Sequence, residues 1–328
     1  MKNFAIGIDL GGTNLKGIIM EGDGSFRHLT RVPTGGQEGG TKVLENILTL
    51  IEKLLKKEGS SESCIGVGLG TPGFVDDDGT VLGGAENLPG WKGTNIYDPI
   101  MQQFGLKTTA TNDVTITALA EAKYGAGKGI KNMVCFALGT GIGGGIVING
   151  KVYKGSHGMA GEIGHIMVDP NGLPCTCGHK GCVEQYASAT GIVNLAKMLA
   201  MKFESDIPST LKRIALETPE SLSAKLVYDY AKDSDPFGQY INEIACEKLA
   251  HAIGIIINTL SPDRVILGGG VMKAGHIILD TVARHIPKYC WQQLWELCDL
   301  VESELGEDAG AIGAAALAFE EIEVEVHV

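Results

Sequence analysis

Apolar residues recur along this chain with two periods, one typical of strands and one typical of helices. Short apolar runs predict buried strands at residues 4–10, 15–20, 64–69, 107–111, 264–267 and 297–302. Apolar positions three and four apart predict helices at residues 41–57, 113–124, 183–201, 237–260, 276–286 and 308–319. Strands alternating with helices indicate an α/β fold with mostly parallel strands. The polar sequence between the predicted helices 183–201 and 237–260 is expected to be irregular, and the acidic tail 320–328 exposed or weakly ordered.

One stretch near the start of the chain recurs further along. Residues 6–20 (IGIDLGGTNLKGIIM) align without a gap with residues 134–148 (VCFALGTGIGGGIVI), and each copy reads as strand, glycine turn, strand. A duplicated hairpin predicts two related α/β halves that face each other. Two glycine turns can also resemble each other by chance, but we favour the duplication.

Both glycine turns contain a threonine. They consist of Gly11, Gly12 and Thr13, and of Gly139, Thr140 and Gly141. Such turns let backbone N–H groups and a hydroxyl approach phosphate oxygens, although any tight turn favours glycine. Only the first turn follows a carboxylate, Asp9, where the second follows Ala137. We expect Asp9 to hold Mg²⁺ and its waters near nucleotide phosphates, with capping of the turn as the alternative.

Two further places combine a predicted strand end with polar or glycine residues. Asn112 and Asp113 open a predicted helix, so either residue fits an N-cap. Asp113 equally fits a general base that the helix N-terminus keeps ionised, with Asn112 bonding a neighbouring hydroxyl. The glycines 268–270 follow another strand, where an adenosine could lie, although a strand-to-helix turn also explains them.

The densest chemistry lies between residues 161 and 184. Cys175, Cys177 and Cys182 stand in a glycine-rich turn, and three thiolates with one imidazole form a closed tetrahedral zinc site. The fourth ligand is His165 or His179. His179 would crowd the turn between the thiols, so we expect His165. Four protein ligands make such a zinc structural, and a disulfide or three idle thiols are the alternatives.

Two glutamates, Glu162 and Glu184, flank this cysteine cluster. An exposed glutamate by itself means little. Held at the two ends of a metal-bound loop, however, their carboxylates are good bidentate acceptors for adjacent sugar hydroxyls. The segment therefore predicts one wall of a sugar site.

Composition narrows the function classes. A chain of 328 residues suits two domains, and a net charge of −12 argues against non-specific nucleic-acid binding. No apolar run is long enough for a signal peptide or a membrane span, so we expect no membrane partner. Eight cysteines without a signal segment indicate reduced thiols or metal ligands and a cytoplasmic protein.

Taken together, the motifs resemble those of ROK-family sugar kinases, within the actin/hexokinase-like ATPase superfamily. The resemblance covers essentially the whole chain and rests on DLGGT (9–13), GTPG (70–73), ND (112–113), LGTG (138–141), GEIGH (161–165), the cysteine cluster with Glu184, and GGG (268–270). It implies an α/β fold of two ribonuclease-H-like (actin/hexokinase-type) domains with a cleft between them and a small zinc knot at 165–182. The smaller domain would be 1–118, with the helix at about 309–320 packing back on it, and the larger 119–308.

The resemblance also implies roles for residues. Asp113 would be the catalytic base that deprotonates the sugar 6-hydroxyl as it attacks the γ-phosphate of MgATP. The sugar-holding positions match Gly73, Asn87, Asn112, Glu162, His165 and Glu184. The zinc ligands match His165, Cys175, Cys177 and Cys182. The two glycine turns match phosphate loops, and Gly269 and Gly270 match the adenosine site.

The expected activity is ATP-dependent phosphorylation of a hexose, with glucose favoured by Glu184 at the end of the knot. Kinases of N-acetylmannosamine, fructose or allose are alternatives with largely shared sugar contacts. A sugar-sensing regulator of the family would carry a helix-turn-helix domain before Asp9, where only eight residues stand. A non-catalytic sugar-binding protein would lack Asp9 or Asp113. We expect a homodimer or homotetramer, with contacts affected by the enlarged segment 203–240.

Overall fold

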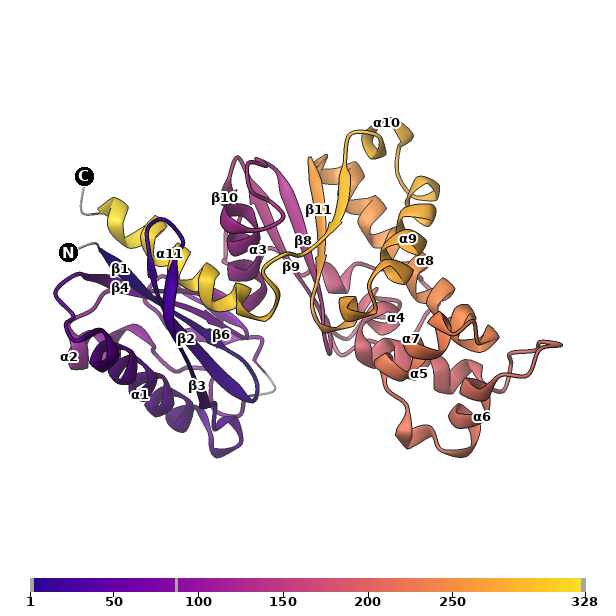
Figure 1. Ribbon diagram of the computed structural model, residues 1–328, viewed down its shortest axis with the longest axis horizontal. Coiled ribbons are helices and arrows are strands. Elements are labelled where there is room, and N and C mark those ends of the chain that lie inside the picture. Colours follow the sequence, from indigo (N-terminus) through magenta and orange to yellow (C-terminus); the bar gives the residue numbers. More distant parts are fainter. Residues whose placement is uncertain (1–2, 86–87, 326–328) are drawn as a thin grey trace. The chain divides into compact units, whose positions relative to one another are not determined.

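The computed structural model describes residues 3–85 and 88–325 and contains two five-stranded sheets (Figure 1). The first has the order β3-β2-β1-β4-β7 and contains β1 (Phe4–Leu10), β2 (Asn14–Glu21), β3 (Phe26–Pro33), β4 (Cys64–Thr71) and β7 (Thr108–Asn112). The second has the order β10-β9-β8-β11-β12 and contains β8 (Met133–Leu138), β9 (Ile142–Ile148), β10 (Lys151–Val152), β11 (Arg264–Gly268) and β12 (Asp299–Glu302). A small hairpin pairs β5 (Phe74–Val75) with β6 (Val81–Gly83).

Helices occupy most of the remaining described chain. The α-helices are α1 (Gly40–Glu58), α2 (Tyr97–Phe104), α3 (Asp113–Tyr124), α4 (Glu184–Ala187), α5 (Ala189–Leu199), α6 (Thr210–Glu217), α7 (Ala224–Lys232), α8 (Pro236–Leu260), α9 (His276–His285), α10 (Gln292–Trp295) and α11 (Ala309–Glu325). Short 3₁₀ helices are η1 (Gly36–Glu38), η2 (Ile163–His165), η3 (Pro219–Ser221), η4 (Gly270–Ala274), η5 (Ile286–Lys288) and η6 (Gly306–Asp308).

When the strands of each large sheet are numbered in chain order within that sheet, both sheets have the order third-second-first-fourth-fifth. In the first, β1 pairs antiparallel with β2 and parallel with β4. In the second, β11 lies parallel to both β8 and β12, while β9 and β10 form an antiparallel pair. The hairpins that correspond in this order, β1–β2 and β8–β9, are the two stretches that align in sequence. The common order therefore supports the interpretation of a duplicated α/β unit.

The chain groups into two compact units. Unit 1 comprises Met1–Lys131, Gly145–Gly161 and Glu304–Val328, and unit 2 comprises Asn132–Gly144 and Glu162–Ser303. The expected boundary after residue 118 falls inside α3. All of α3 belongs to unit 1, because Ile116 and Leu119 are buried in a hydrophobic cluster with residues of α11.

Helices cover both faces of the sheet in unit 1. Alternate residues of β1, such as Ile6 and Ile8, are buried in a cluster with the apolar stripe of α1, while Ala5 lies in a cluster with α3 and α11. The alanine-rich helix α11 approaches the other face closely. A Cβ at Gly68 of β4 would lie 1.7 Å from the Ala314 carbonyl oxygen, so glycine is required there. This contact joins the end of the chain to its first half.

The segment after residue 203 is more regular than its sequence predicts. It forms α6 and α7, whose N-caps are Ser209 and Ser223 with hydroxyls that accept hydrogen bonds from the backbone N–H groups of Lys212 and Leu226. The expectation of irregular structure was therefore wrong. Each of these helices buries only two or three residues, which is too short an apolar stripe for periodicity to reveal.

Two other expectations differ from the structure. The expected single helix at 183–201 is two helices, because Ser188 has an extended backbone and caps α5 through Gly191 N–H. The acidic tail is helical up to Glu325, since Ile322 is buried and Glu320 forms an ion pair with Lys123 at 2.8 Å. Residues 326–328 lie outside the described residues.

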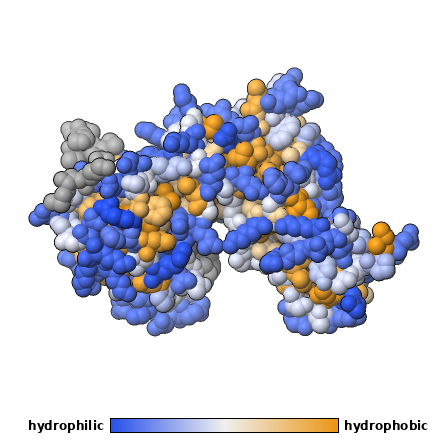
Figure 2. Space-filling model, in the orientation of Figure 1, coloured by the Kyte–Doolittle hydropathy of each residue, from blue (hydrophilic) through white to orange (hydrophobic). Residues whose placement is uncertain are grey.

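Hydrophilic residues cover most of the face that Figure 2 shows, with scattered hydrophobic areas on both units. None of the helices within residues 3–85 and 88–325 is long and apolar enough to cross a membrane.

Candidate active site

Asp9 is the buried carboxylate of the first glycine hairpin. The register of β1 and β2 pairs Asp9 with Lys16, so both side chains lie on one face of the sheet. Burial and the nearby Asp113 raise the pKa of Asp9 from 3.8 to about 6, while Lys16 opposes this rise. The Lys16 ammonium lies 3.3 Å from the Asp308 carboxylate, just before α11. The ionised form of Asp9 is therefore unfavourable, and the cation that stabilises it is Lys16.

The start of α11 lies against the same carboxylate. A Cβ at Gly310 would lie 2.6 Å from the Asp9 carboxyl group, which explains a glycine in the first turn of α11. The positive end of a helix dipole favours a negative charge at this place. The turn itself is fixed from behind, because the Thr34 hydroxyl donates to the Gly11 carbonyl at 2.6 Å. Gly12 and Thr13 remain exposed and can contact a ligand.

Of the two residues Asn112 and Asp113, Asn112 is the N-cap that the sequence left open. The side-chain oxygen of Asn112 accepts a hydrogen bond from Val114 N–H at 2.9 Å and is the N-cap of α3. Asp113 begins the helix, and burial raises the pKa of its carboxyl group against the opposing effect of the Val114 N–H. The structure brings Asp113 and Asp9 together in unit 1, where each carboxylate is buried.

Gly73 lies close to these residues in unit 1. Thr71 at the end of β4 pairs with Asn112 at the end of β7, and Gly73 follows two residues later with φ 87°. A Cβ at Gly73 would lie 2.3 Å from the Gly83 carbonyl oxygen, so a larger residue would push the β5–β6 hairpin away. Asn87, the other predicted sugar contact on this segment, lies outside the described residues.

The second glycine turn, in unit 2, is held by Glu184. One oxygen of this carboxylate accepts a hydrogen bond from Ile142 N–H at 2.9 Å. A Cβ at Gly141 would lie 2.3 Å from that same oxygen, so the glycine makes room for the carboxylate. Glu184 begins α4, and Ala189 N–H donates to the Gly139 carbonyl at 2.9 Å. The structure thus places Glu184 against the turn, a contact that the sequence did not predict.

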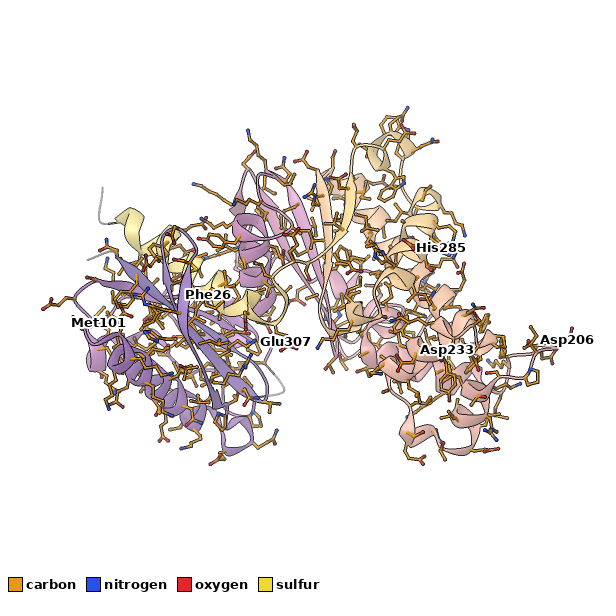
Figure 3. The ribbon with its side chains drawn as sticks, viewed as in Figure 1. Phe26, Met101, Asp206, Asp233, His285 and Glu307 are labelled. Atoms are coloured by element: carbon orange, nitrogen blue, oxygen red, sulfur yellow. The ribbon has the colours of Figure 1, made fainter. Side chains whose placement is uncertain are left out.

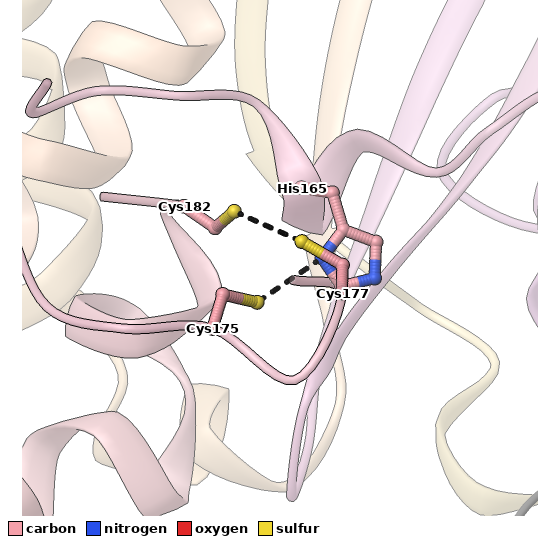
Figure 4. A group of neighbouring side chains, drawn as sticks. All are labelled: His165, Cys175, Cys177 and Cys182. Carbon is pink, nitrogen blue, oxygen red and sulfur yellow. Dashed lines mark hydrogen bonds between the residues drawn. The ribbon is translucent and has the colours of Figure 1, made fainter. Parts of the chain in front are cut away.

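Four predicted metal ligands form one cluster in unit 2 (Figure 4). The Nδ1 atom of His165 and the sulfurs of Cys175, Cys177 and Cys182 all lie within 4.8 Å of one another. The distances are 3.5 Å from Cys175 Sγ to His165 Nδ1 and 3.6 Å from Cys177 Sγ to Cys182 Sγ. The exposed His179 is not part of the cluster.

The cluster fits zinc. Zn–S bonds of about 2.3 Å and Zn–N bonds of about 2.0 Å put tetrahedral ligand atoms about 3.3–3.8 Å apart, and the two distances given above, 3.5 Å and 3.6 Å, agree with this. A disulfide would need sulfurs about 2.05 Å apart. Burial alone would raise the pKa of Cys175, but hydrogen bonds from Cys177, Cys182 and His165 lower it to about 7, which favours the thiolate that a metal requires.

The imidazole of His165 connects this cluster to Glu162. With Nδ1 turned to the sulfurs, Nε2 lies 3.8 Å from the Glu162 carboxylate. A metal on Nδ1 would fix the ring and leave Nε2 as a hydrogen-bond donor beside a half-exposed carboxylate. These two residues therefore present a donor and an acceptor side by side in unit 2.

Unit 2 also contains a cavity of about 540 Å³. Gly139 and Thr140 of the second turn line it, as does Gly270 at the start of η4. The neighbouring Gly269 is not part of the lining, and a Cβ there would lie 2.5 Å from the Leu138 carbonyl oxygen. Sequence reasoning missed the remaining walls, which come from α7 and η4 and include Ala224, Tyr228, Val271 and Ala274. The N-cap Ser223 was the available signal for α7.

Comparison with known proteins places this fold and these motifs in a known class. The family model described as ROK family matches residues 5–321, and the chain belongs to this family. A glucokinase of Halalkalibacterium halodurans is 38% identical, over 95% of this chain and 94% of the relative. A ROK family glucokinase from Streptomyces griseus, solved in complex with glucose and AMPPNP, has a TM-score of 0.78 and 29% identity over 97% of this chain and all of that one. The Bacillus subtilis xylose repressor is 25% identical and is 77% covered.

Proposed function

We propose that this protein is an ATP-dependent hexokinase that phosphorylates the 6-hydroxyl of glucose. The observation that carries the proposal is the 38% identity to a glucokinase over nearly the full length of both chains. The buried carboxylates and the lined cavity described above supply the groups that the reaction needs. The Bacillus subtilis xylose repressor is less similar to this chain and extends beyond the matched region.

Asp113 is the proposed general base. Its burial raises its pKa, which makes the carboxylate a better proton acceptor, and the Asn112 cap fixes the start of α3. As the proton of the sugar 6-hydroxyl passes to Asp113, the oxygen forms a bond to the γ-phosphorus. The bond between that phosphorus and the β–γ bridging oxygen breaks, and the products are glucose 6-phosphate and ADP.

Asp9 and the two glycine turns are the proposed phosphate-binding elements. Asp9 would hold Mg²⁺ through its waters, and the exposed Gly12 and Thr13 would approach phosphate oxygens. The cavity lined by Thr140 and Gly270 suits the adenosine, because alanine and valine side chains from α7 and η4 supply apolar walls for a base. ATP is therefore the proposed donor.

The proposed sugar contacts are Gly73, Asn87, Asn112, Glu162, His165 and Glu184. Zinc, held by His165 and the three cysteines, would supply rigidity and take no part in phosphoryl transfer. His165 Nε2 and Glu162 offer an adjacent donor and acceptor for neighbouring hydroxyls. Because one oxygen of Glu184 is bonded to Ile142, this residue would connect the sugar to the second turn.

A coupled assay of ADP release tests the proposal with glucose, N-acetylmannosamine, fructose and allose. Glucose is expected to have the highest kcat/KM. Asp113→Asn should lower kcat about 10²–10⁴-fold while glucose binding persists. Asp206→Asn is the matched control, since Asp206 lies on an exposed loop between α5 and α6 (Figure 3) and should retain full activity. Turnover of none of the four sugars would overturn the proposal.

Self-association and location remain predictions. A homodimer or homotetramer is expected, and light scattering coupled to size-exclusion chromatography measures it directly. A monomer at micromolar concentration would contradict this expectation. The predicted cytoplasmic location is tested by fractionating cells that produce the protein.

A further inference from the structure

A cavity of about 830 Å³ in unit 1 has no part in the proposed reaction. Its walls come from β7, from the turn between β5 and β6, from α2, from residues 154–159 and from the end of α11. None of the predicted sugar, nucleotide or metal positions within the described residues lines it. Its volume falls within the range of about 300–1,000 Å³ that is usual for ligand pockets.

The cavity opens on an edge of the first sheet. Strand β7 has a neighbouring strand, β4, on one side only. On its other side, Ala110 N–H donates to the Tyr97 hydroxyl at 2.8 Å. Because this side chain occupies a ladder position, the edge is protected against an added peptide strand. The cavity is therefore better suited to a small ligand.

The floor of the cavity is polar. The carboxylate of Glu321 accepts hydrogen bonds from the Thr109 hydroxyl and the Lys154 ammonium, so its charge is already neutralised. On the opposite face of β7, the Thr108 hydroxyl oxygen is buried and has no hydrogen-bond partner within the described part of the chain. A buried hydroxyl without a partner is unfavourable, and a ligand that both donates and accepts hydrogen bonds would satisfy it. Ser156 provides another hydroxyl on the facing loop.

The charges and apolar side chains narrow the ligand class. The lining contains four carboxylates, Asp76, Asp77, Asp98 and Glu321, against two ammonium groups, Lys107 and Lys154, and this excess of negative charge disfavours an anion such as a sugar phosphate or a nucleotide. Two of these carboxylates already have partners, because Glu321 is paired with Lys154 and Asp76 accepts hydrogen bonds from the backbone N–H groups of Asp78 and Thr80. Apolar side chains at the opening are Leu82, Met101 and Met159, which are 44%, 45% and 42% exposed (Met101 is labelled in Figure 3). They can cover the C–H faces of sugar rings.

We infer that this cavity is a binding site for a neutral saccharide, separate from the catalytic sugar site. Hydroxyl groups match the unpartnered Thr108 and the fixed fork of Glu321, and ring faces match the methionines. The wall at residues 154–159 continues directly into Gly161 and Glu162, so an occupant would contact the loop that leads to the proposed sugar contacts. The inference does not rest on the proposed kinase activity, since it uses unit 1 alone.

Methionine methyl groups report on this site. The full chain, labelled with [¹³C]methyl-methionine, is titrated with glucose and with maltose, and Met101→Leu and Met159→Leu assign the two cavity signals. Both signals are expected to shift in a saturable way with at least one of the sugars. Met272 on η4 in unit 2 serves as the internal reference. Each sugar is added to a 100-fold excess over the protein and up to saturation of the catalytic site. If neither the Met101 nor the Met159 signal shifts, the inference is overturned.

Matched variants locate the site. Thr108→Val removes the buried hydroxyl at almost constant volume and should weaken saccharide binding about 2- to 10-fold. Thr30→Val changes a threonine on β3, the opposite edge of the same sheet, and should leave binding unchanged. Ser156→Trp fills the cavity from an exposed loop without disturbing the core and should abolish the shifts. Equal shifts in all three variants would place the saccharide elsewhere and overturn the inference. Glucose turnover is measured in parallel. If turnover persists while these binding results fail, the inference is overturned and the proposed function stands.

Discussion

The two sheets share a strand order but differ in the charge that each hairpin carries. The first hairpin has Asp9 near the end of β1, a carboxylate whose pKa burial raises to about 6. The second has Ala137 at the corresponding position, and its turn is instead held by Glu184 from outside the hairpin. One copy therefore keeps an unfavourable charge and the other does not. Such a cost points to a function for Asp9, because a structural turn works without it, as the second copy demonstrates.

The largest expected effect is that removal of the metal destabilises unit 2 and leaves unit 1 unchanged. If the cluster holds zinc as proposed, a chelator should destabilise unit 2 by several kcal/mol, because the candidate ligands His165, Cys175, Cys177 and Cys182 belong to a segment whose residues 170–180 are mostly exposed. Unit 1 contains none of these ligands and should keep its protection. Hydrogen exchange with mass spectrometry, resolved by peptide, measures both. Loss of protection in β1 and β4 equal to that around residues 165–182 would contradict the prediction, and added zinc should restore unit 2.

Asp9→Asn is expected to lower the activity and to raise the stability of the protein. Loss of the charge that is proposed to hold Mg²⁺ should lower kcat about 10²–10³-fold. The folded-state pKa of Asp9, about 6, lies above its ordinary 3.8, so the ionised carboxylate costs stability at pH values above about 6, and this cost disappears as the pH falls towards 4. A shift of this size corresponds to about 3 kcal/mol. Urea unfolding at pH 8 should show the variant to be more stable by about 1–3 kcal/mol.

The control for this prediction is pH itself. Near pH 4 the wild-type carboxyl group is protonated in the folded chain, so the stability difference from Asp9→Asn should nearly vanish. A variant that is less stable than the wild type at pH 8 would mean that the carboxylate holds the hairpin together. The comparison with Ala137 would then lose its meaning.

Whether an element could be predicted from the sequence depended on the length of its apolar pattern. The stripe of α1 and the two glycine hairpins are long or repeated, and they appear in the structure within one or two residues. Strand β3 was missed because most of its side chains are partly or fully exposed, which removes the apolar alternation. Helix α7 was missed because it buries only Val227, Tyr228 and Ala231, and the cavity walls it supplies were missed with it.

Contacts between distant parts of the chain could not be predicted at all. Nothing near Asp9 in the sequence indicates that Gly310 will lie against its carboxylate. The bond from Ile142 N–H to Glu184 likewise joins two motifs that were interpreted separately. Motif spacing identifies the chemistry of each residue, whereas its partners depend on how α4 and α11 pack.

Gly141→Ala tests the contact of Glu184 with the second glycine turn, in the copy that has Ala137 where the first has Asp9. The added methyl group would meet the Glu184 carboxylate at 2.3 Å, so the bond to Ile142 N–H must break or the turn must shift. We expect a loss of about 1–3 kcal/mol in stability and a raised KM for ATP. Gly59→Ala, at the end of α1 with open space around it, is the control. Gly59 has φ 86°, a strained conformation for alanine that Gly141 does not share, so the two variants are compared by their KM for ATP and not by their stability. An equal KM for ATP in both variants would rule out the Glu184 contact as the cause.

The smallest expected effect concerns the acid side of the pH profile. Activity should fall below about pH 6 as the carboxyl groups of Asp9 and Asp113 take up protons, and the observed midpoint belongs to the pair because the two interact. Lys16 lowers the pKa of Asp9, so Lys16→Met should move the midpoint of kcat/KM to higher pH. Lys53→Met on the exposed face of α1 should leave the midpoint unchanged. Because a general loss of stability would lower the whole profile without displacing it, only a displaced midpoint assigns to Lys16 the task of keeping Asp9 ionised.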